Sequence, residues 1–476
     1  MSKIEVNTVE PQCGTTLTLG GSGDTVTLGS GASQSGFGRT GTVDWQTGSI
    51  KTATFTAANG EGYFANTTSG AFTMNLPSSP SAGNIVSVKD YAGTFDNNNL
   101  TVGRGGSNIE GQASDKVLSD ESQAVTFVYV DATKGWLVIN DMNTSQVPSF
   151  VAATGGNSTA TCGDYKIHTF TGPGTFCVTS AGNVAGNNKI EYLVVAGGGG
   201  GGGPQGGGGG GAGGLRFAST SIAPLTYPAK PLAGTEITAA AQAYPIAVGG
   251  GGAKGSSGSG GGGCCSQEGT SGTNSSFSII TSAGGGGGGV GQAPRGPEAQ
   301  GKNGGSGGGG GGRAGSGTGS SAPATGAPGG SGNNPPVTPA QGTDGGKSRT
   351  TGSPPNADRG GGGGGAIAAG SNAGGSTDPG GAGGAGGGFP TAFGSNGQPC
   401  GSFRYYAGGG GGGLDGPPGC AGAGGLGGGA AGIKDSTPGS NATDNTGGGG
   451  GGAGTSHPIS GTNGGSGIVV IRYKFQ

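Results

Sequence analysis

Uninterrupted runs of glycine constrain this chain more than any other feature of its sequence. Because glycine loses more conformational freedom on folding than any other residue, an ordered glycine run must hydrogen-bond nearly all of its backbone groups. A random linker has no reason to repeat one run length, yet many of these runs are six residues long. The runs occupy 197–203, 206–211, 249–252, 260–263, 284–289, 307–312, 360–365, 408–413 and 447–452.

The run length suits a helix with three residues per turn. Six residues of polyproline II backbone span about 19 Å, or two turns. Chains without side chains approach one another closely, as glycine does in collagen, but the runs are pure glycine rather than a strict every-third-residue pattern. The runs therefore predict bundled polyglycine II helices that bond to their neighbours through N–H and C=O groups, with weaker Cα–H contacts added. The alternative, a disordered linker, is disfavoured because structured-looking segments such as 244–248 and 277–281 adjoin the runs.

Composition and charge exclude several function classes. Glycine supplies 129 of 476 residues, and the formal net charge is −2, from 22 basic and 24 acidic residues. The near-equal numbers of basic and acidic residues leave no excess of positive charge that would indicate binding to nucleic acid or to an anionic membrane. No apolar run is long enough for a transmembrane helix, so we expect no membrane insertion. The N-terminus lacks the apolar stretch of a signal peptide, and we expect synthesis in a cytoplasm.

Two N-terminal regions are predicted before the glycine runs. Residues 1–45 repeat a short strand-like unit at 16–20 and 25–29, which predicts a trimeric β-collar or shaft. The alternative is an arm that orders only on a docking partner. Residues 46–143 predict a β-sandwich or barrel, because short strands alternate with turn signals. Its strands are expected at 51–57, 62–67, 71–76, 84–90, 99–103, 124–130 and 135–139, with Trp136, Phe127, Phe72, Val86 and Leu137 in the core.

The rest of the chain predicts a linker and a glycine-rich domain. Residues 144–163 are rich in Thr, Ser and Gly and predict the linker, and 164–476 form the domain. Within this domain, strands are expected at 164–170, 174–179, 189–196 and 467–473. The segments 190–195 and 467–473 have the same apolar, strand-like composition, so we expect them to pair with each other. The glycine runs between them would then be one long insertion on a β-base. The fold class is all-β plus polyglycine II, and no helical period is found.

The order of motifs in the C-terminal part resembles the glycine-rich domains of phage tail fibres and adhesins. The resemblance covers roughly 165–476 and rests on the sequences at 191–197, 213–216, 244–250, 274–277 and 467–473. Residues 1–145 also resemble tail-fibre proteins of marine phages, at 4–11 and 62–83. The resemblance implies a homotrimeric fibre of the virion, joined through its N-terminus to the phage tail or an adaptor. It further implies a polyglycine II sandwich whose loops contact a bacterial receptor, either lipopolysaccharide or an outer-membrane protein.

Loops with large side chains are the candidates for receptor binding. Aromatic residues and arginine are enriched in binding hot spots, and aromatic faces suit sugar rings. The main candidates are Phe389, Phe393, Phe403, Arg404, Tyr405 and Tyr406, with Arg295, Asp415 and His457 in weaker loops. In the alternative, Phe403 and Tyr405 cap one end of the bundle.

Catalytic and metal signals are weak. The glycines at 196–214 match a dinucleotide fingerprint only trivially, since no helix follows. Cys162 with Cys177, and Cys400 with Cys420, are either free thiols or disulfides, and no zinc spacing is found. We therefore expect no enzyme activity, no catalytic residue, no metal and no cofactor. The competing functions are a purely structural virion protein, an ice-binding protein and a carbohydrate-cleaving tailspike, whose paired carboxylates would come from Asp115, Asp120 and Glu121.

Overall fold

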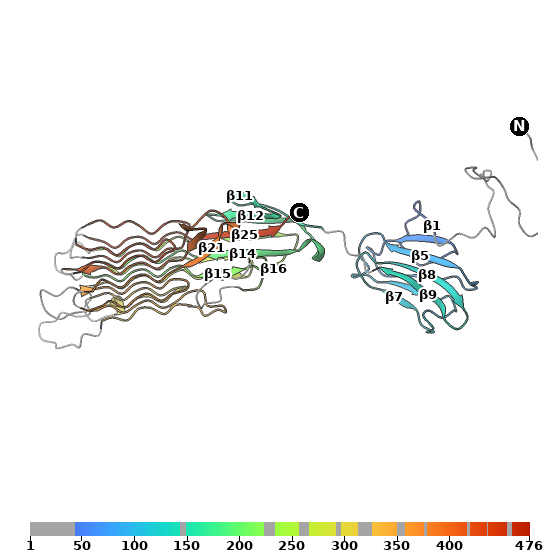
Figure 1. The fold of residues 1–476 in the computed structure, drawn as a ribbon, viewed down its shortest axis with the longest axis horizontal. Helices are drawn as coiled ribbons and strands as arrows, with labels where there is room; N and C mark the ends of the chain where they lie inside the picture. The colour runs from blue at the N-terminus through green and yellow to red at the C-terminus, as the bar shows by residue number, and fades with distance from the viewer. Residues whose placement is uncertain are drawn as a thin grey trace, which may run out of the picture. The chain divides into compact units, whose positions relative to one another are not determined.

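The chain divides into two compact units, Met1–Ser145 and Gln146–Gln476. The computed structural model describes residues 43–142, 149–222, 234–256, 266–291, 297–312, 326–349, 358–375, 378–416, 419–435, 437–454 and 459–476. The predicted all-β class is confirmed, since these residues form several open sheets (Figure 1). Their helical content is three single 3-10 turns, η1 (Val184–Gly186), η2 (Pro297–Ala299) and η3 (Thr391–Phe393). The predicted shaft at 1–45 lies almost wholly outside the described residues.

The first unit contains two sheets between which the chain alternates. One sheet has the order β1-β3-β5-β8-β9 and the other β2-β4-β6-β7. Neighbours among β1, β3 and β5 are parallel, as are neighbours among β2, β4 and β6, so the chain winds in successive coils. The strands are β1 (Asp44–Trp45), β2 (Phe55–Thr56), β3 (Glu61–Ala65), β4 (Phe72–Asn75), β5 (Ile85–Asp90), β6 (Leu100–Gly103), β7 (Lys116–Leu118), β8 (Ala124–Asp131) and β9 (Gly135–Met142).

One apolar core fills the first unit. Trp136, Phe127 and Val86 are fully buried in it, as predicted, and Phe72 packs at its edge. Leu137 is only half-buried and lies outside this core, because successive residues of a strand point to opposite faces and its neighbour Trp136 points inward.

The second unit starts from a base of two sheets. The orders are β10-β13-β17-β18-β19 and β11-β12-β25-β14-β15, with β16 also paired to β14. The predicted pairing of 190–195 with 467–473 is confirmed, since β14 and β25 are antiparallel neighbours from Ile190–Tyr473 to Val195–Ile468. The strands are β10 (Val151–Thr154), β11 (Ser158–Cys162), β12 (Tyr165–Phe170), β13 (Gly174–Ala181), β14 (Lys189–Val195), β15 (Leu215–Ala218), β16 (Ile237–Thr238), β17 (Ala243–Ala247), β18 (Ser275–Phe277), β19 (Ile280–Ser282) and β25 (Ile468–Lys474).

The stretch expected to be a linker, 144–163, contributes strands β10 and β11 to the base. Its Thr and Ser residues are typical of a linker, but threonine also favours strands. The strands form because β13 and β12 offer free edges to them. Composition alone does not separate a polar edge strand from a linker.

A buried histidine lies in the core between the two base sheets. His168 on β12 is 1% exposed, and its ring stacks against Tyr473 with centroids 5.6 Å apart. Its Nδ1 lies 2.7 Å from the Gly155 carbonyl oxygen, and its Nε2 lies 3.1 Å from the Tyr473 hydroxyl oxygen. Burial lowers the pKa of His168 below its ordinary value of 6.5.

This lowered pKa predicts a loss of stability in acid. The native state favours neutral His168, so the unfolded state binds more protons once the pH falls below about 6.5. The contribution of neutral His168 to the free energy of unfolding is complete above that pH, and it is lost as the pH falls toward the lowered pKa. We expect the free energy of unfolding of this unit to fall with a slope of at most about 1.4 kcal/mol per pH unit from this group. Denaturant melts at several pH values give the free energy of unfolding as a function of pH. Its slope should be shallower for His168→Gln than for His457→Gln, and equal slopes would show that His168 is not the group responsible.

The glycine runs bond to their neighbours with a period of three. Gly197, Gly200 and Gly203 donate to carbonyl groups of segment 267–273, at distances of 2.9–3.1 Å. The intervening residues of the run donate in the same way to two other segments, 462–465 and 208–211. A period of three belongs neither to an α-helix, at 3.6, nor to a β-strand, at 2.

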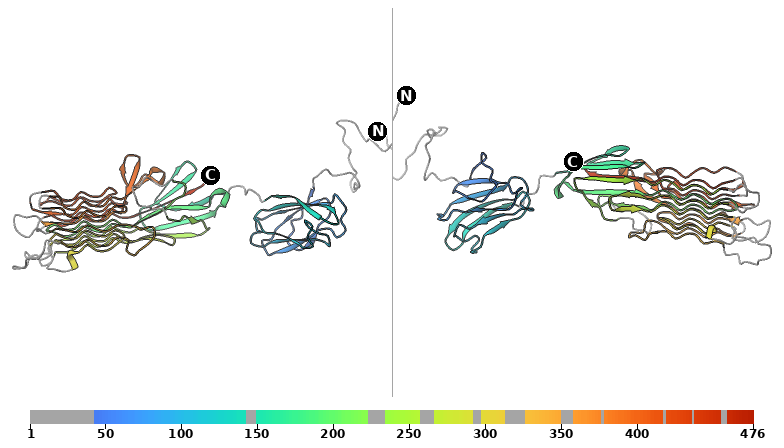
Figure 2. Two further views of the ribbon diagram at one scale, coloured as in Figure 1. Left: turned by 60° about the horizontal axis from the view of Figure 1, so that its bottom comes forward. Right: turned by 180° about the vertical axis from the view of Figure 1, so that it is seen from behind.

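The interior runs are bonded on all sides. Run 197–203 donates to three segments, and its carbonyl groups accept from three further segments, 249–255, 284–290 and 447–454. The runs lie side by side in all the views (Figure 1, Figure 2). A Cβ on Gly198 or Gly410 would lie 2.0 Å from a carbonyl oxygen of the adjacent segment. Six close neighbours leave no space for a side chain, which explains why the interior runs are pure glycine.

The runs alternate between leaving the base sheets and returning to them. Run 197–203 leaves β14, turns at 204–206 and returns as 207–214 into β15. The turn at 204–206 therefore marks the far end of the bundle, opposite the base. By the same connectivity, 297–299 and 414–416 lie at the far end, and the segment 387–406 lies at the base end.

Candidate functional site

The aromatic candidates lie at the base end of the bundle. They belong to a small sheet of order β21-β23-β22, formed by β21 (Gly387–Pro390), β22 (Gln398–Cys400) and β23 (Phe403–Tyr406). Figure 1 shows β21 beside the base strands. This sheet covers the face of β14 and β25 that points away from the main base core.

Three of the six aromatic-segment candidates are core residues. Phe389, Phe393 and Tyr406 are at most 1% exposed and share a cluster with Leu193 and Phe217. The rings of Phe389 and Phe393 lie 4.9 and 5.2 Å from the ring of Phe217. The Tyr406 hydroxyl donates to the Asn396 carbonyl oxygen at 2.6 Å, and burial raises the Tyr406 pKa. In this fold these three side chains cannot touch a receptor, because the base sheet needs them to cover its second face.

The other three, Phe403, Arg404 and Tyr405, are half-buried on β23. Tyr405 is paired with Gly388 on β21, and a Cβ on Gly388 would lie 2.6 Å from Cζ of the Tyr405 ring. The Tyr405 ring therefore lies flat on the adjacent strand instead of projecting from the surface.

Of the weaker candidates, Asp415 lies at the far end. Asp415 is half-buried on β24 (Leu414–Asp415), which pairs with β20 (Asp358–Arg359). Arg359 is fully buried there, and its Nε donates to the Asp378 carbonyl oxygen at 2.7 Å. Arg295 and His457 lie outside the described residues.

A set of polar side chains at the perimeter of the bundle was not singled out in the sequence. A perimeter segment lacks a neighbour on one side, and a side-chain oxygen from the next segment accepts its outward N–H. The Asn463 Oδ1 accepts from the Lys254 N–H at 2.9 Å, and the Thr270 Oγ1 accepts from the Ala253 N–H at 2.7 Å. Equivalent caps come from Asn303, Asp344, Asn372, Asn441 and Asp444.

A sequence signal for these caps exists. In 269–274, glycine recurs at every third residue, with Gly269 and Gly272 facing inward and Thr270 and Thr273 supplying caps. This pattern is less conspicuous in the sequence than an uninterrupted glycine run, because a perimeter segment needs glycine only on its inward face.

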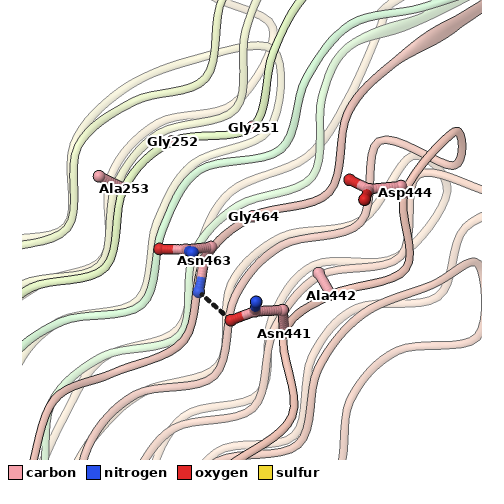
Figure 3. A pocket seen from close by; sticks show the side chains of 8 residues that line it. All are labelled: Gly251, Gly252, Ala253, Asn441, Ala442, Asp444, Asn463 and Gly464. Carbon is pink, nitrogen blue, oxygen red and sulfur yellow. Dashed lines mark hydrogen bonds between the residues drawn. The ribbon is translucent and has the colours of Figure 1, made fainter. Parts of the chain in front are cut away.

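A groove opens on the perimeter between 251–253, 441–444 and 463–464. Its volume is about 340 Å³, and its lining residues are Gly251, Gly252, Ala253, Asn441, Ala442, Asp444, Asn463 and Gly464. Figure 3 shows the Asp444 carboxylate and the Asn441 amide on one side of it, with Asn463 beside them. The groove is therefore polar, with two alanines as its only apolar side chains.

Several other site types find no support in the described part of the chain. No group of three or more His, Cys, Asp or Glu residues there could hold a metal ion. Cys162, Cys177, Cys400 and Cys420 are free, so neither suggested disulfide is formed. Cys162 lies on β11 and Cys177 on β13, in different sheets. Among the described helices, none has the length and apolar character needed to cross a membrane.

Residues 169–474 match the family described as "Glycine-rich domain". The chain belongs to this glycine-rich domain family. The match begins in β12 and ends at the last residue of β25, so the family includes most of the base strands and all the glycine runs. Comparison with curated protein sequences gives no match to the chain.

Proposed function

We propose that the glycine runs form a polyglycine II bundle. The support is the hydrogen-bond period of three, which equals the three residues per turn of a polyproline II helix. Donation to three neighbours and acceptance from three others is the pattern expected when such helices pack on all sides. A bundle held by backbone hydrogen bonds throughout is a rigid support for the loops at its ends.

We further propose that the chain is a non-enzymatic adhesin of a bacteriophage tail fibre, which recognises the bacterial surface during adsorption. The observation that carries this proposal is the alternation of the runs in the glycine-rich domain: the described turns between an outgoing and a returning run, such as 204–206, lie at the far end, away from the base. Loops on a rigid scaffold are the usual place for recognition. The sequence resemblance supplies the context, with a homotrimer attached to the phage tail or an adaptor through its N-terminus.

The receptor on this proposal is lipopolysaccharide or an outer-membrane protein, and the proposed contact residues come from the segments that connect the glycine runs. Arg295, Asp415 and His457 are preferred over the aromatic segment, because Phe389, Phe393 and Tyr406 are buried. Phe403, Arg404 and Tyr405 are half-buried at the base end of the bundle.

Adsorption competition tests the proposal. The purified full chain is expected to block phage attachment to host cells in a dose-dependent way. The triple variant Arg295→Ala, Asp415→Ala and His457→Ala is expected to need about tenfold more protein for the same block, since a few residues carry most binding energy. Lys254→Ala with Lys347→Ala is the control, because both are exposed cations on the flank of the bundle. A folded chain that fails to compete would overturn the adhesin function and favour a purely structural virion protein.

A further inference from the structure

The groove on the perimeter of the bundle contains polar groups that the fold leaves unused. Asn441 uses its Oδ1 to accept from the Asn463 N–H at 3.0 Å, and Asp444 uses its Oδ1 to accept from the Ser466 N–H at 3.0 Å. Asn463 uses its Oδ1 for the Lys254 N–H. Each side chain is thus held by one atom, while the Asn441 Nδ2, the Asn463 Nδ2 and the Asp444 Oδ2 make no further bond within the described residues.

A backbone donor completes this set. The outward N–H of Lys254 is capped by Asn463, and Gly251 lies one period of three earlier on the same segment. The Gly251 N–H therefore points the same way, toward the groove that Gly251 lines, and no described residue accepts from it. The groove offers neutral amide donors from the backbone and from side chains, beside one carboxylate acceptor.

These groups select a chemical class of ligand. No cation lines the groove, and Asp444 is negative, so an anion would be repelled. The methyl groups of Ala253 and Ala442 would bury too little apolar area to bind an apolar molecule. A sugar hydroxyl both donates and accepts, so adjacent hydroxyls can donate to the Asp444 carboxylate and accept from the amide N–H groups. A volume of about 340 Å³ is at the small end of ligand sites and suits a short saccharide.

We propose that this groove is a binding site for a neutral saccharide, on the flank of the bundle and apart from the far-end loops. The site does not depend on the proposed adhesin function. Because the groove is open and lacks an aromatic platform, a dissociation constant on the order of 1 mM is expected for one sugar unit.

Saturation-transfer NMR on the full chain tests this with the methyl glycosides of glucose, galactose and mannose, each alone. At least one is expected to receive saturation and to titrate. Asp444→Asn keeps an Oδ1 cap for Ser466 but replaces the free acceptor by a donor. Asn441→Asp keeps the cap for Asn463 but replaces the free donor by an acceptor. Each variant should bind about tenfold more weakly or worse, because each reverses a hydrogen-bonding group.

Matched controls exist elsewhere on the perimeter. Asp344→Asn and Asn372→Asp make the same changes at the same kind of cap, at the Gly332 N–H and the Lys347 N–H, outside the groove. Both controls should bind like the wild type, and all four variants should unfold at similar denaturant concentrations. The proposal is overturned if none of the three sugars binds or if the controls lose binding equally. A groove variant that loses sugar but still blocks phage adsorption leaves the adhesin function intact.

Discussion

Replacing Gly201 by Ala should lower the free energy of unfolding of the glycine-rich unit by about 4 kcal/mol or more. A Cβ at this position would lie 1.9 Å from the Gly451 carbonyl oxygen and 2.3 Å from its carbonyl carbon. The obstacle is backbone, and it cannot rotate away as a side chain can. Shifting either segment would also weaken the bond from the Gly201 N–H to the Thr462 carbonyl oxygen, which is 2.9 Å long.

Gly250→Ala is the matched control, because it makes the same change in another glycine run. The nearest atom to a Cβ there is the Thr273 Oγ1 at 4.0 Å, and Gly250 is exposed. We expect this variant to be neutral or more stable by about 0.4–1 kcal/mol, since alanine restricts the unfolded chain.

The two units can be followed separately in one denaturation experiment. Both tryptophans, Trp45 and Trp136, belong to the first unit, so their fluorescence reports on that unit alone. Near-ultraviolet circular dichroism includes the tyrosines of both units, so the part of its change that does not follow the tryptophan fluorescence reports on the glycine-rich domain. Gly201→Ala should shift only the second transition. Equal midpoints for Gly201→Ala and Gly250→Ala would show that the runs are not closely packed.

The second large effect is expected from Glu191→Ala in the base. Glu191 and Arg472 are directly opposite in the β14–β25 register, and their side chains are 2% and 6% exposed. Arg472 Nη1 bonds to Glu191 Oε2, and the Ser221 hydroxyl donates to Glu191 Oε1. The guanidinium Cζ also lies 3.5 Å from the centroid of the Tyr165 ring. Removing the carboxylate leaves a buried, uncompensated cation, and we expect a loss of about 3–5 kcal/mol.

Two comparisons separate this effect from an ordinary loss of packing. Lys474, on the same strand β25, forms a surface pair with Asp164 at 3.9 Å, and the two side chains are 31% and 60% exposed. Lys474→Ala should cost about 0.2–1 kcal/mol at most. The double change Glu191→Leu with Arg472→Met should regain most of the loss, because apolar replacement of both partners removes the stranded charge. If the double variant is as unstable as Glu191→Ala, the charge is not the cause. The readout is the second unfolding transition.

Much of the fold is predictable because it depends on local patterns. The sequence pattern locates most strands of the first unit and, in the second unit, β12, β13, β14 and β25 to within a few residues, and the shared character of 190–195 and 467–473 predicts the β14–β25 pair. The buried Glu191–Arg472 pair follows from that register once the two strands are aligned. Six-residue glycine runs predict close backbone contact, because only glycine permits it.

Which segments become neighbours is decided by the tertiary structure. Turn signals locate the ends of the strands but not their partners, and β1, β3 and β5 pair in parallel because the chain visits the other sheet between them. The same holds for the candidate site. The aromatic segment has the composition of a recognition loop. Its residues Phe389, Phe393 and Tyr406 are nevertheless buried, because they cover the second face of β14 and β25. The caps from Asn441, Asp444 and Asn463 arise only where a run lacks a neighbour, and that is a property of the assembled bundle. The pairing of β14 with β25 and the close contact of the runs were predictable, because each follows from a residue pattern within the segments themselves. Which surfaces remain open was not predictable, because it follows from the packing of all the runs together and no single segment carries a pattern that reports it.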